Sequence, residues 1–216
     1  MVEWSIAAFR ACGSVRSIVV AVPPAHAHEL GGEELTVVAG GAARAQSVAN
    51  ALEAVETDLV AIHDAARPLL TPGLIEALVG RLDADSGGAG VIAAAPVTDT
   101  LKQASASTSA AFAGPGRENA ALVVARTLDR SRLWAAQTPQ IFRTAALREA
   151  LAVDTAARDA ATDEAMLVEA TGGRVLLHPA PAENLKVTVP LDLEIAAMLL
   201  SRRAGGGALP ATRLLG

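Results

Sequence analysis

The sequence predicts an α/β protein with a doubly wound, mostly parallel sheet. Three observations lead to this prediction. Strand-like apolar runs alternate with helical segments between Leu35 and Ala95, an order typical of parallel sheets. The runs are continuously apolar, as expected of strands that helices cover on both faces. Hydrophobic residues make up 51% of the 216 residues, enough to fill a sizeable core.

The N-terminal elements are short. Residues Trp4–Cys12 predict a helix that ends at Gly13, because glycine commonly follows the last turn of a helix. The β-branched run Ser17–Val22 predicts a buried strand, which two prolines stop. Leu35–Val38 predicts a second strand, and residues 44–56 predict a helix with one apolar face.

The next elements continue the alternation. Leu59–Ile62 predicts a third strand, and Val91–Ala95 predicts a fourth. Between them, Thr71 followed by Pro72 predicts the start of a helix, since threonine is a favoured N-cap and proline a favoured first residue.

The pattern then changes to a projecting arm at about residues 97–130. Residues 103–120 are small and polar and contain glycine and proline, which predicts a loop. The flanks Val97–Lys102 and Leu122–Asp129 predict the two strands of a hairpin. A lone hairpin is marginally stable in water, so we expect the arm to mediate a homodimer.

The remaining chain completes one domain, residues 1–204. Its expected elements are helices near 144–153 and 162–171, strands at Arg174–His178 and Asn184–Thr188, and a helix from near Pro190. We expect residues 205–216 to form a flexible tail.

Composition and charge exclude several classes of function. The net charge is -5, aromatic residues are 2% and tyrosine is absent, which argues against a nucleic-acid partner. The single cysteine, Cys12, excludes an intramolecular disulfide and a multi-cysteine zinc site. No uncharged apolar run is long enough to span a membrane, and the first residues lack the pattern of a signal peptide. We therefore expect a cytoplasmic protein without a membrane partner.

The segment His63–Pro68 follows the third predicted strand, where ligands bind in open α/β sheets. A carboxylate such as Asp64 can hold Mg²⁺ or a ribose hydroxyl there, and Arg67 suits a phosphate. The structural alternative is a turn in which Asp64 caps the backbone and pairs with Arg67.

Three further motifs also have structural alternatives. Gly40-Gly41 lets a base approach the backbone closely, or simply makes a tight turn. The segment Thr162–Glu164 provides a hydroxyl and acids, or a helix start with a capping threonine and acids in the first turn. Lys186 ends a short predicted strand, where a solvated charge is the usual explanation.

Taken together and in order, these motifs resemble those of the 2-C-methyl-D-erythritol 4-phosphate cytidylyltransferases. The similar segments are Gly40-Gly41 with residues 44–47, then 63–68, 95–102, 127–134, 137–140, 162–164 and 183–188. The resemblance extends over nearly the whole chain. It implies a nucleotide-diphospho-sugar transferase-like fold and a homodimer whose arms cross the interface. It also implies transfer of CMP from CTP to 2-C-methyl-D-erythritol 4-phosphate, giving 4-diphosphocytidyl-2-C-methyl-D-erythritol and pyrophosphate.

The resemblance also implies roles for individual residues. Arg130 and Lys186 would be catalytic and hold the attacking phosphate, while Mg²⁺, with Asp64 as its ligand, would neutralise charge on the triphosphate. The residues implied to bind substrate are Asp64, Ala65, Arg67, Thr100, Thr138, Thr162 and Thr188, and those implied to contact cytosine are Gly40, Gly41 and Ser47.

The sequence departs from the family pattern in two places. Members begin with a strand and a Gly-rich loop that carries an arginine and a lysine, whereas this sequence opens on the following helix. Ala42 stands where the family often has an acid. We therefore expect the domain to lack its first strand and loop, and the activity of this chain to be low. The alternatives are a cytidylyltransferase for another polyol phosphate, such as ribitol 5-phosphate, and an inactive truncated dimerisation partner.

Overall fold

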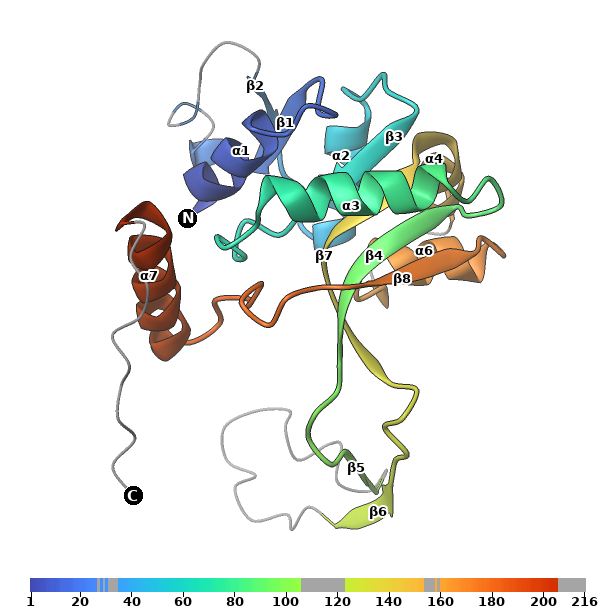
Figure 1. Ribbon diagram of the computed structural model, residues 1–216. Coiled ribbons are helices and arrows are strands. Elements are labelled where there is room, and N and C mark those ends of the chain that lie inside the picture. Colours follow the sequence, from blue (N-terminus) through green and yellow to red (C-terminus); the bar gives the residue numbers. More distant parts are fainter. Residues whose placement is uncertain are drawn as a thin grey trace. The chain divides into compact units, whose positions relative to one another are not determined.

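The computed structural model describes residues 1–26, 28, 30, 35–105, 123–153, 158 and 160–205 (Figure 1). It divides into two units, each described here by itself. The first comprises Met1–Ala94 with Gln137–Gly216, and the second Ala95–Ala136. The expected flexible tail, apart from Gly205, and most of the expected arm loop lie outside the described residues.

The first unit contains a four-stranded sheet of order β3-β7-β4-β8. Its strands are β3 (Leu59–Ile62), β7 (Trp134–Arg143), β4 (Gly90–Pro96) and β8 (Val175–Pro179). β4 pairs with β8 in parallel, whereas β3 pairs with β7 antiparallel. A second, parallel pair consists of β1 (Ile18–Val22) and β2 (Leu35–Ala39). A short 3₁₀ helix, η1 (Pro24–His26), follows β1.

Helices cover both faces of this sheet (Figure 1). On one face α1 (Val2–Arg10) and α3 (Pro72–Asp83) pack against apolar side chains of β3, β4 and β7. On the other face lie α2 (Arg44–Leu52), α4 (Thr144–Leu151) and α6 (Glu164–Ala170). The central strand β4 is buried on both sides, which explains its continuous apolar run. The predicted doubly wound, mostly parallel α/β fold is confirmed.

The helix-start prediction at Thr71 is confirmed, whereas the stop at Gly13 is wrong. Thr71 Oγ1 accepts a hydrogen bond from the Leu74 amide, and Pro72 is the first residue of α3. α1 already ends at Arg10, where the right-handed Ala11 and its amide bonds close the last turn. Gly13 does not have the positive φ of a glycine cap.

Strand β7 was not predicted from the sequence, and one predicted strand does not form. β7 runs through Thr138 and Pro139, and proline in a strand interior argues against a central strand because it cannot donate to the ladder. Residues 184–188 were expected to be a strand but are irregular. Their backbone is held by single contacts instead: the Val187 amide donates to the Ala66 carbonyl, and the Thr188 amide to the Asp192 carboxylate. The last helix, α7 (Pro190–Gly205), starts where predicted.

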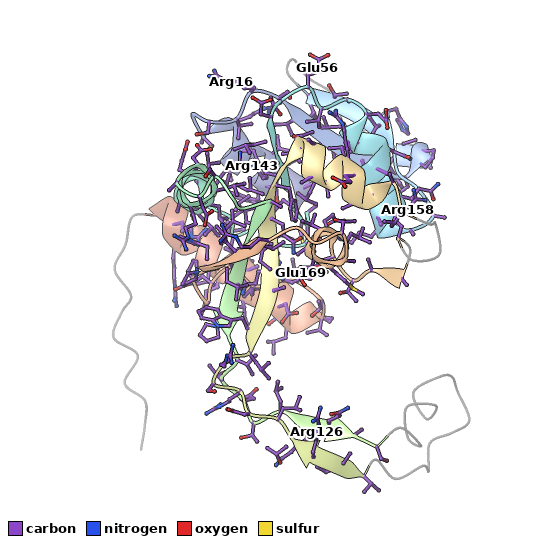
Figure 2. All side chains as sticks on the ribbon, turned by 90° about the vertical axis from the view of Figure 1, so that its right-hand side faces the viewer. Arg16, Glu56, Arg126, Arg143, Arg158 and Glu169 are labelled. Atoms are coloured by element: carbon purple, nitrogen blue, oxygen red, sulfur yellow. The ribbon has the colours of Figure 1, made fainter. Side chains whose placement is uncertain are left out.

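The second unit contains the predicted hairpin. β5 (Lys102–Ala104) pairs antiparallel with β6 (Val124–Thr127). β5 lies later than the predicted flank, because it extends into the stretch expected to be loop. Cross-strand side chains support the pairing: Arg126, labelled in Figure 2, donates to Gln103 at 2.6 Å. Every residue of both strands is exposed, so the hairpin buries little surface of its own.

The first unit also contains an apolar cavity of about 700 Å³ between β1 and β3. Helices α1 and α2 line its two faces, through residues such as Ile6 and Val48. Among the described residues, β1 pairs only with β2 and β3 only with β7, so each strand presents an unpaired edge. Arg16 precedes β1 and Glu56 precedes β3, and Figure 2 shows both at the same end of this unit. The cavity therefore lies between two unpaired strand edges.

Candidate active site

Asp64 is the centre of a charged cluster at the carboxyl end of β3. Its Oδ1 accepts hydrogen bonds from Nε and a terminal nitrogen of Arg44, each at 3.2 Å. Its Oδ2 lies 3.2 Å from the Nζ of Lys186. Each carboxylate oxygen of Asp64 is therefore held by a different cation.

Three segments that are distant in the sequence form this cluster. Asp64 follows β3, and Arg44 is the first residue of α2, just after the turn that ends β2. Lys186 belongs to the irregular segment before α7. The hydrogen bond from Val187 to Ala66 places that segment beside the residues that follow β3. The predicted site residues Asp64 and Lys186 are thus brought together.

Glu164 is a fourth, buried member of the cluster. Both of its carboxylate oxygens lie 2.6 Å from one guanidinium nitrogen of Arg44, and the residue is 0% exposed. Glu164 is the first residue of α6, and the N-cap of that helix is Asp163, whose side chain accepts from the Met166 amide. The expectation that Thr162 caps this helix is wrong. Thr162 is exposed, and the aspartate is one residue nearer the helix.

The two acids of the cluster have pKa values that move in opposite directions. Burial raises the pKa of Asp64, but Arg44 and Lys186 lower it and prevail, so it falls below its ordinary value. Burial raises the pKa of Glu164, and Arg44 offsets this only in part, so the pKa stays above its ordinary value. Asp64 is therefore firmly ionised at neutral pH.

The two cations of the cluster are partly exposed to solvent, whereas one of its acids is buried. The side chains of Arg44 and Lys186 are 37% and 46% exposed, whereas that of Glu164 is 1% exposed. The two positive and two negative charges cancel. An incoming phosphate can approach both cations, and Lys186 is free to exchange Asp64 for a phosphate because its contact is a half-exposed ion pair.

His63 and Thr138 hold the backbone beside Asp64. The Asp64 amide donates to Thr138 Oγ1 at 3.0 Å, and that oxygen lies 3.0 Å from His63 Nδ1. His63 Nε2 lies 3.2 Å from the Arg67 carbonyl oxygen. Burial lowers the pKa of His63 to about 4, so the ring is neutral at pH 7.

Arg67 is buried behind the cluster rather than paired with Asp64. Its guanidinium donates to the Asn184 backbone carbonyl at 2.7 Å, and the side-chain amide nitrogen of Asn184 donates to Gln137 Oε1 and to the Thr138 carbonyl. Among the described residues, no ion pair joins Arg67 to Asp64, so that structural alternative is wrong. In this structure Arg67 ties the turn after β3 to the Lys186 segment.

The turn after β2 is crowded at its first glycine. A Cβ on Gly40 would lie 3.2 Å from Ser47 Oγ and 3.3 Å from the Val22 carbonyl oxygen. Ser47 Oγ accepts from the Gly41 amide at 3.0 Å and donates to the Ala43 carbonyl at 3.2 Å. Ser47 therefore shapes the turn that positions Arg44, whatever else it contacts.

The other predicted site residues are more scattered. Ala65 is exposed and lines the cavity beside Asp64. Thr188 donates to Asp192 at 2.7 Å, so its hydroxyl serves the start of α7. Thr100 and Arg130 lie in the second unit, and both are exposed.

Arg44 and Glu164 are the residues that the sequence analysis did not include in its site. Both lie within motifs that it used, Arg44 at the head of residues 44–47 and Glu164 in residues 162–164. The sequence offered one signal, the position of each residue at or near the start of a predicted helix. That the two helices lie on the same face of the sheet is known only from the structure.

A divalent cation would find one suitable protein ligand here. The described residues contain no group of three or more histidine, cysteine, aspartate or glutamate side chains placed to bind a metal. Glu164 is buried against Arg44, which leaves Asp64. Mg²⁺ often binds through one or two carboxylates together with substrate phosphates. The site therefore fits a cation that arrives with, and is held mainly by, a phosphorylated substrate.

Comparisons with known proteins identify similar chains. Residues 1–202 match the model of a family described as IspD, 2-C-methyl-D-erythritol 4-phosphate cytidylyltransferase. An enzyme of that name from Paraburkholderia phytofirmans is 41% identical over 215 residues, covering 94% of this chain and 85% of that protein. The bifunctional enzyme IspD/IspF of an Anaeromyxobacter species is 46% identical over 200 residues, covering 88% of this chain and 47% of that protein.

Solved structures are similar as well. The crystal structure of 2-C-methyl-D-erythritol 4-phosphate cytidylyltransferase from Thermus thermophilus matches with a TM-score of 0.75 and 34% identity, covering 92% of this chain and 88% of that one. In the described part of the chain, no helix combines the length and apolar character needed to cross a lipid bilayer.

Proposed function

Because this chain belongs to the 2-C-methyl-D-erythritol 4-phosphate cytidylyltransferase family, we propose that the cluster of Arg44, Asp64 and Lys186 is its catalytic site. The reaction transfers CMP from CTP to 2-C-methyl-D-erythritol 4-phosphate and releases pyrophosphate. The observation that carries the proposal is the Asp64 carboxylate held between two partly exposed cations, Arg44 and Lys186, at the end of a sheet strand.

The reaction depends mainly on positioning the two substrates and on stabilising negative charge on their phosphates. An oxygen of the polyol phosphate attacks the α-phosphorus of CTP, and the bond from that phosphorus to the bridging oxygen of the β-phosphate breaks. Negative charge accumulates on both phosphate groups, so cations fixed in advance lower the barrier. We assign Lys186 and Arg130 to hold the attacking phosphate. Lys186 would release Asp64 as the phosphate arrives.

The family's nucleotidyl transfer generally depends on a divalent cation, and we propose Mg²⁺. When bound, it neutralises charge on the triphosphate. Asp64 would be its protein ligand, since this carboxylate stays ionised and loses Lys186 when the substrate phosphate binds.

The remaining substrate contacts are proposals as well. The turn of Gly40 and Gly41 ends β2, and Ser47 Oγ accepts from the Gly41 amide, which supports a place for cytosine against the backbone of this turn. The residues proposed to surround the polyol phosphate are Ala65, Arg67, Thr100, Thr138, Thr162 and Thr188.

We propose that a further strand completes the sheet between β1 and β3. The support is the apolar cavity there, the unpaired edge on each side, and the helices that already cover both faces. A strand buried on both faces must be wholly apolar. Parallel strands need a long crossover, and α1, which leads into β1, suits that role. The strand would then precede α1, as the resemblance implies.

The same cavity explains where the Gly-rich loop would act. Arg44, Asp64 and Lys186 line the cavity together with the apolar residues of β1 and β3. A strand entering alongside β1 would therefore end next to the cluster. The loop that follows it would add its arginine and lysine to the cations already there.

A homodimer and a cytoplasmic location complete the proposal. The hairpin of β5 and β6 is fully exposed, and the neighbouring Val123 is 58% exposed, so a second copy of the chain would supply the surface that the hairpin lacks. The single cysteine supports the cytoplasm.

A substrate panel tests the function. A protein that carries the proposed strand and Gly-rich loop ahead of Met1 would be supplied with CTP, Mg²⁺ and either 2-C-methyl-D-erythritol 4-phosphate or ribitol 5-phosphate, and pyrophosphate release would be measured. We expect the methylerythritol phosphate to have the higher kcat/KM. A preference for ribitol 5-phosphate would replace the proposed substrate, and no turnover with either would contradict the proposed function.

A further inference from the structure

Three hydrogen bonds form a continuous chain behind the catalytic carboxylate. They connect the Asp64 amide to Thr138 Oγ1, that hydroxyl to His63 Nδ1, and His63 Nε2 to the Arg67 carbonyl oxygen, at 3.0, 3.0 and 3.2 Å. Thr138 is 4% exposed, so its hydroxyl has little water to bond with instead. Each group in the chain therefore depends on its neighbour.

The carbonyl oxygen at the end of this chain determines which atom donates and which accepts in each hydrogen bond. A carbonyl oxygen only accepts, so His63 Nε2 must carry the ring proton that it shares with Arg67. In a neutral ring the other nitrogen, Nδ1, then has no proton and can only accept. The hydrogen between Thr138 and His63 therefore belongs to the Thr138 hydroxyl.

The hydrogen and one lone pair of the Thr138 hydroxyl are therefore already used in hydrogen bonds. Its single hydrogen goes to His63, and one of its two lone pairs accepts from the Asp64 amide. One lone pair remains. Thr138 can therefore accept a hydrogen bond from a substrate but cannot donate one.

We propose that His63 is a positioning residue for Asp64, which acts through Thr138 as its Nε2-protonated tautomer. Because His63 Nδ1 accepts the hydrogen bond from the Thr138 hydroxyl, the lone pairs of that oxygen face the Asp64 amide and the substrate. The proposal rests on the proposed function for its effect on turnover. The proposal also implies that Thr138 accepts a hydrogen bond from a donor on the substrate, such as a polyol hydroxyl, and does not bind a phosphate oxygen.

The surroundings of His63 support a fixed ring. Phe9 of α1 contacts it edge to face, with ring centroids 5.7 Å apart. The charged groups beside it are Asp64 and Arg67, which both belong to its own turn. The ring therefore has packing on one side and a hydrogen bond at each nitrogen, and these together select one orientation.

Two substitutions separate the two hydrogen bonds of the ring. The amide oxygen of His63→Asn can take the place of Nδ1 and accept from Thr138, whereas the amide of His63→Gln reaches the place of Nε2 and can donate to Arg67. We expect His63→Gln to lower kcat about tenfold with the KM for CTP unchanged, because a buried donor loses its acceptor. His63→Asn should retain more of the activity.

Substitutions of Thr138 supply the matched control. Thr138→Ser keeps the hydroxyl and should retain more activity than Thr138→Val, which removes it and should lose at least as much as His63→Gln. The double variant of His63→Gln with Thr138→Val should lose little more than Thr138→Val alone, because His63 acts through the Thr138 hydroxyl. Equal losses for His63→Asn and His63→Gln would overturn the proposal.

A spectroscopic measurement tests the tautomer without any turnover. Nitrogen-15 correlation spectra of the histidine rings at pH 7 distinguish a protonated from an unprotonated ring nitrogen, and His63→Asn identifies the signal of His63 among the 4 histidines. We expect a protonated Nε2 and an unprotonated Nδ1 in the free protein. A protonated Nδ1 would overturn the proposal even if the protein is the expected cytidylyltransferase, and the expected spectrum would stand even if it is not.

Discussion

Both carboxylate oxygens of Glu164 lie 2.6 Å from the same guanidinium nitrogen of Arg44. Glu164 has no exposure to water, whereas the other edge of Arg44 reaches Asp64 near the surface. Arg44 therefore connects the buried Glu164 to Asp64, which we propose is catalytic. A buried carboxylate without its cation is strongly unfavourable, which makes this pair a sensitive point of the fold.

The first prediction concerns stability. Arg44→Ala should lower the free energy of unfolding by about 2–3 kcal/mol, below the roughly 3–5 kcal/mol of a fully buried pair because Arg44 is partly exposed. Glu164→Gln in the same background should recover much of the loss, since it removes the buried carboxylate charge that Arg44 no longer pairs with. Urea unfolding of the two variants measures this, and a double variant less stable than Arg44→Ala would contradict it.

The second prediction concerns pH. Burial already holds the pKa of Glu164 above its ordinary 4.5, and Arg44→Ala removes the attraction that opposes burial. A carboxyl whose pKa is higher in the folded than in the unfolded protein favours folding at acid pH, and loses that advantage as pH rises through the interval between the two values. The stability deficit of Arg44→Ala should therefore grow from pH 4.5 upward. A constant deficit in urea unfolding across this interval would count against the assignment.

The sequence predicted the fold well where local patterns determine the structure. The strand at Leu59–Ile62 and the helix start at Thr71 follow from a β-branched run and a cap. β7 could not be found this way, because its pairing with β3 joins residues about 80 apart and its Pro139 argues against a strand. Long-range pairing decided that element, and no local pattern encodes it.

The site was predicted in part for a similar reason. Asp64 and Lys186 were identified through motifs, and the structure places them 3.2 Å apart. Glu164 looks in the sequence like an ordinary acid in the first turn of a helix. Its partner is 120 positions away, so its role depends on how α2 and α6 pack on one face of the sheet.

The third prediction tests the charge at the substrate phosphate. In the protein extended by the proposed strand and Gly-rich loop, Lys186→Ala should lower kcat/KM for the polyol phosphate about tenfold to a hundredfold, the range expected for a hydrogen bond to a charged group. The affinity for CTP should change much less. Lys186→Arg is the control, because it keeps the charge. A Lys186→Ala variant that loses mainly CTP affinity would reverse the assigned role.

The fourth prediction tests the proposed strand between β1 and β3. Amides of Ile18–Val22 and Leu59–Ile62 that face the cavity should exchange hydrogen rapidly in the chain of 216 residues, because no described strand pairs with them. In a protein extended ahead of Met1 by an apolar strand, the same amides should become protected. Exchange measured by mass spectrometry compares the two. Strong protection of both edges in the shorter chain would contradict the proposal.

The final prediction is that two chains share each active site through their arms. The hairpin of β5 and β6 buries too little surface to be stable alone, and Arg130 follows it within the same unit. If each arm reaches the other chain, Arg130 of one chain completes the cluster of Asp64 and Lys186 in its partner. In a protein that also carries the proposed strand and Gly-rich loop ahead of Met1, Arg130→Ala and Asp64→Asn chains should then each be nearly inactive as homodimers.

Mixing the two inactive variants distinguishes a shared site from a self-contained one. In a heterodimer with shared sites, one site combines both substitutions and the other has neither, so activity should reappear. Random exchange makes about half of the dimers mixed, and each has one intact site, so about a quarter of the original activity is expected. Two differently tagged chains would confirm exchange by native mass spectrometry. No recovery despite confirmed exchange would mean that Arg130 serves the site of its own chain, because each mixed dimer would then carry one substitution in each site.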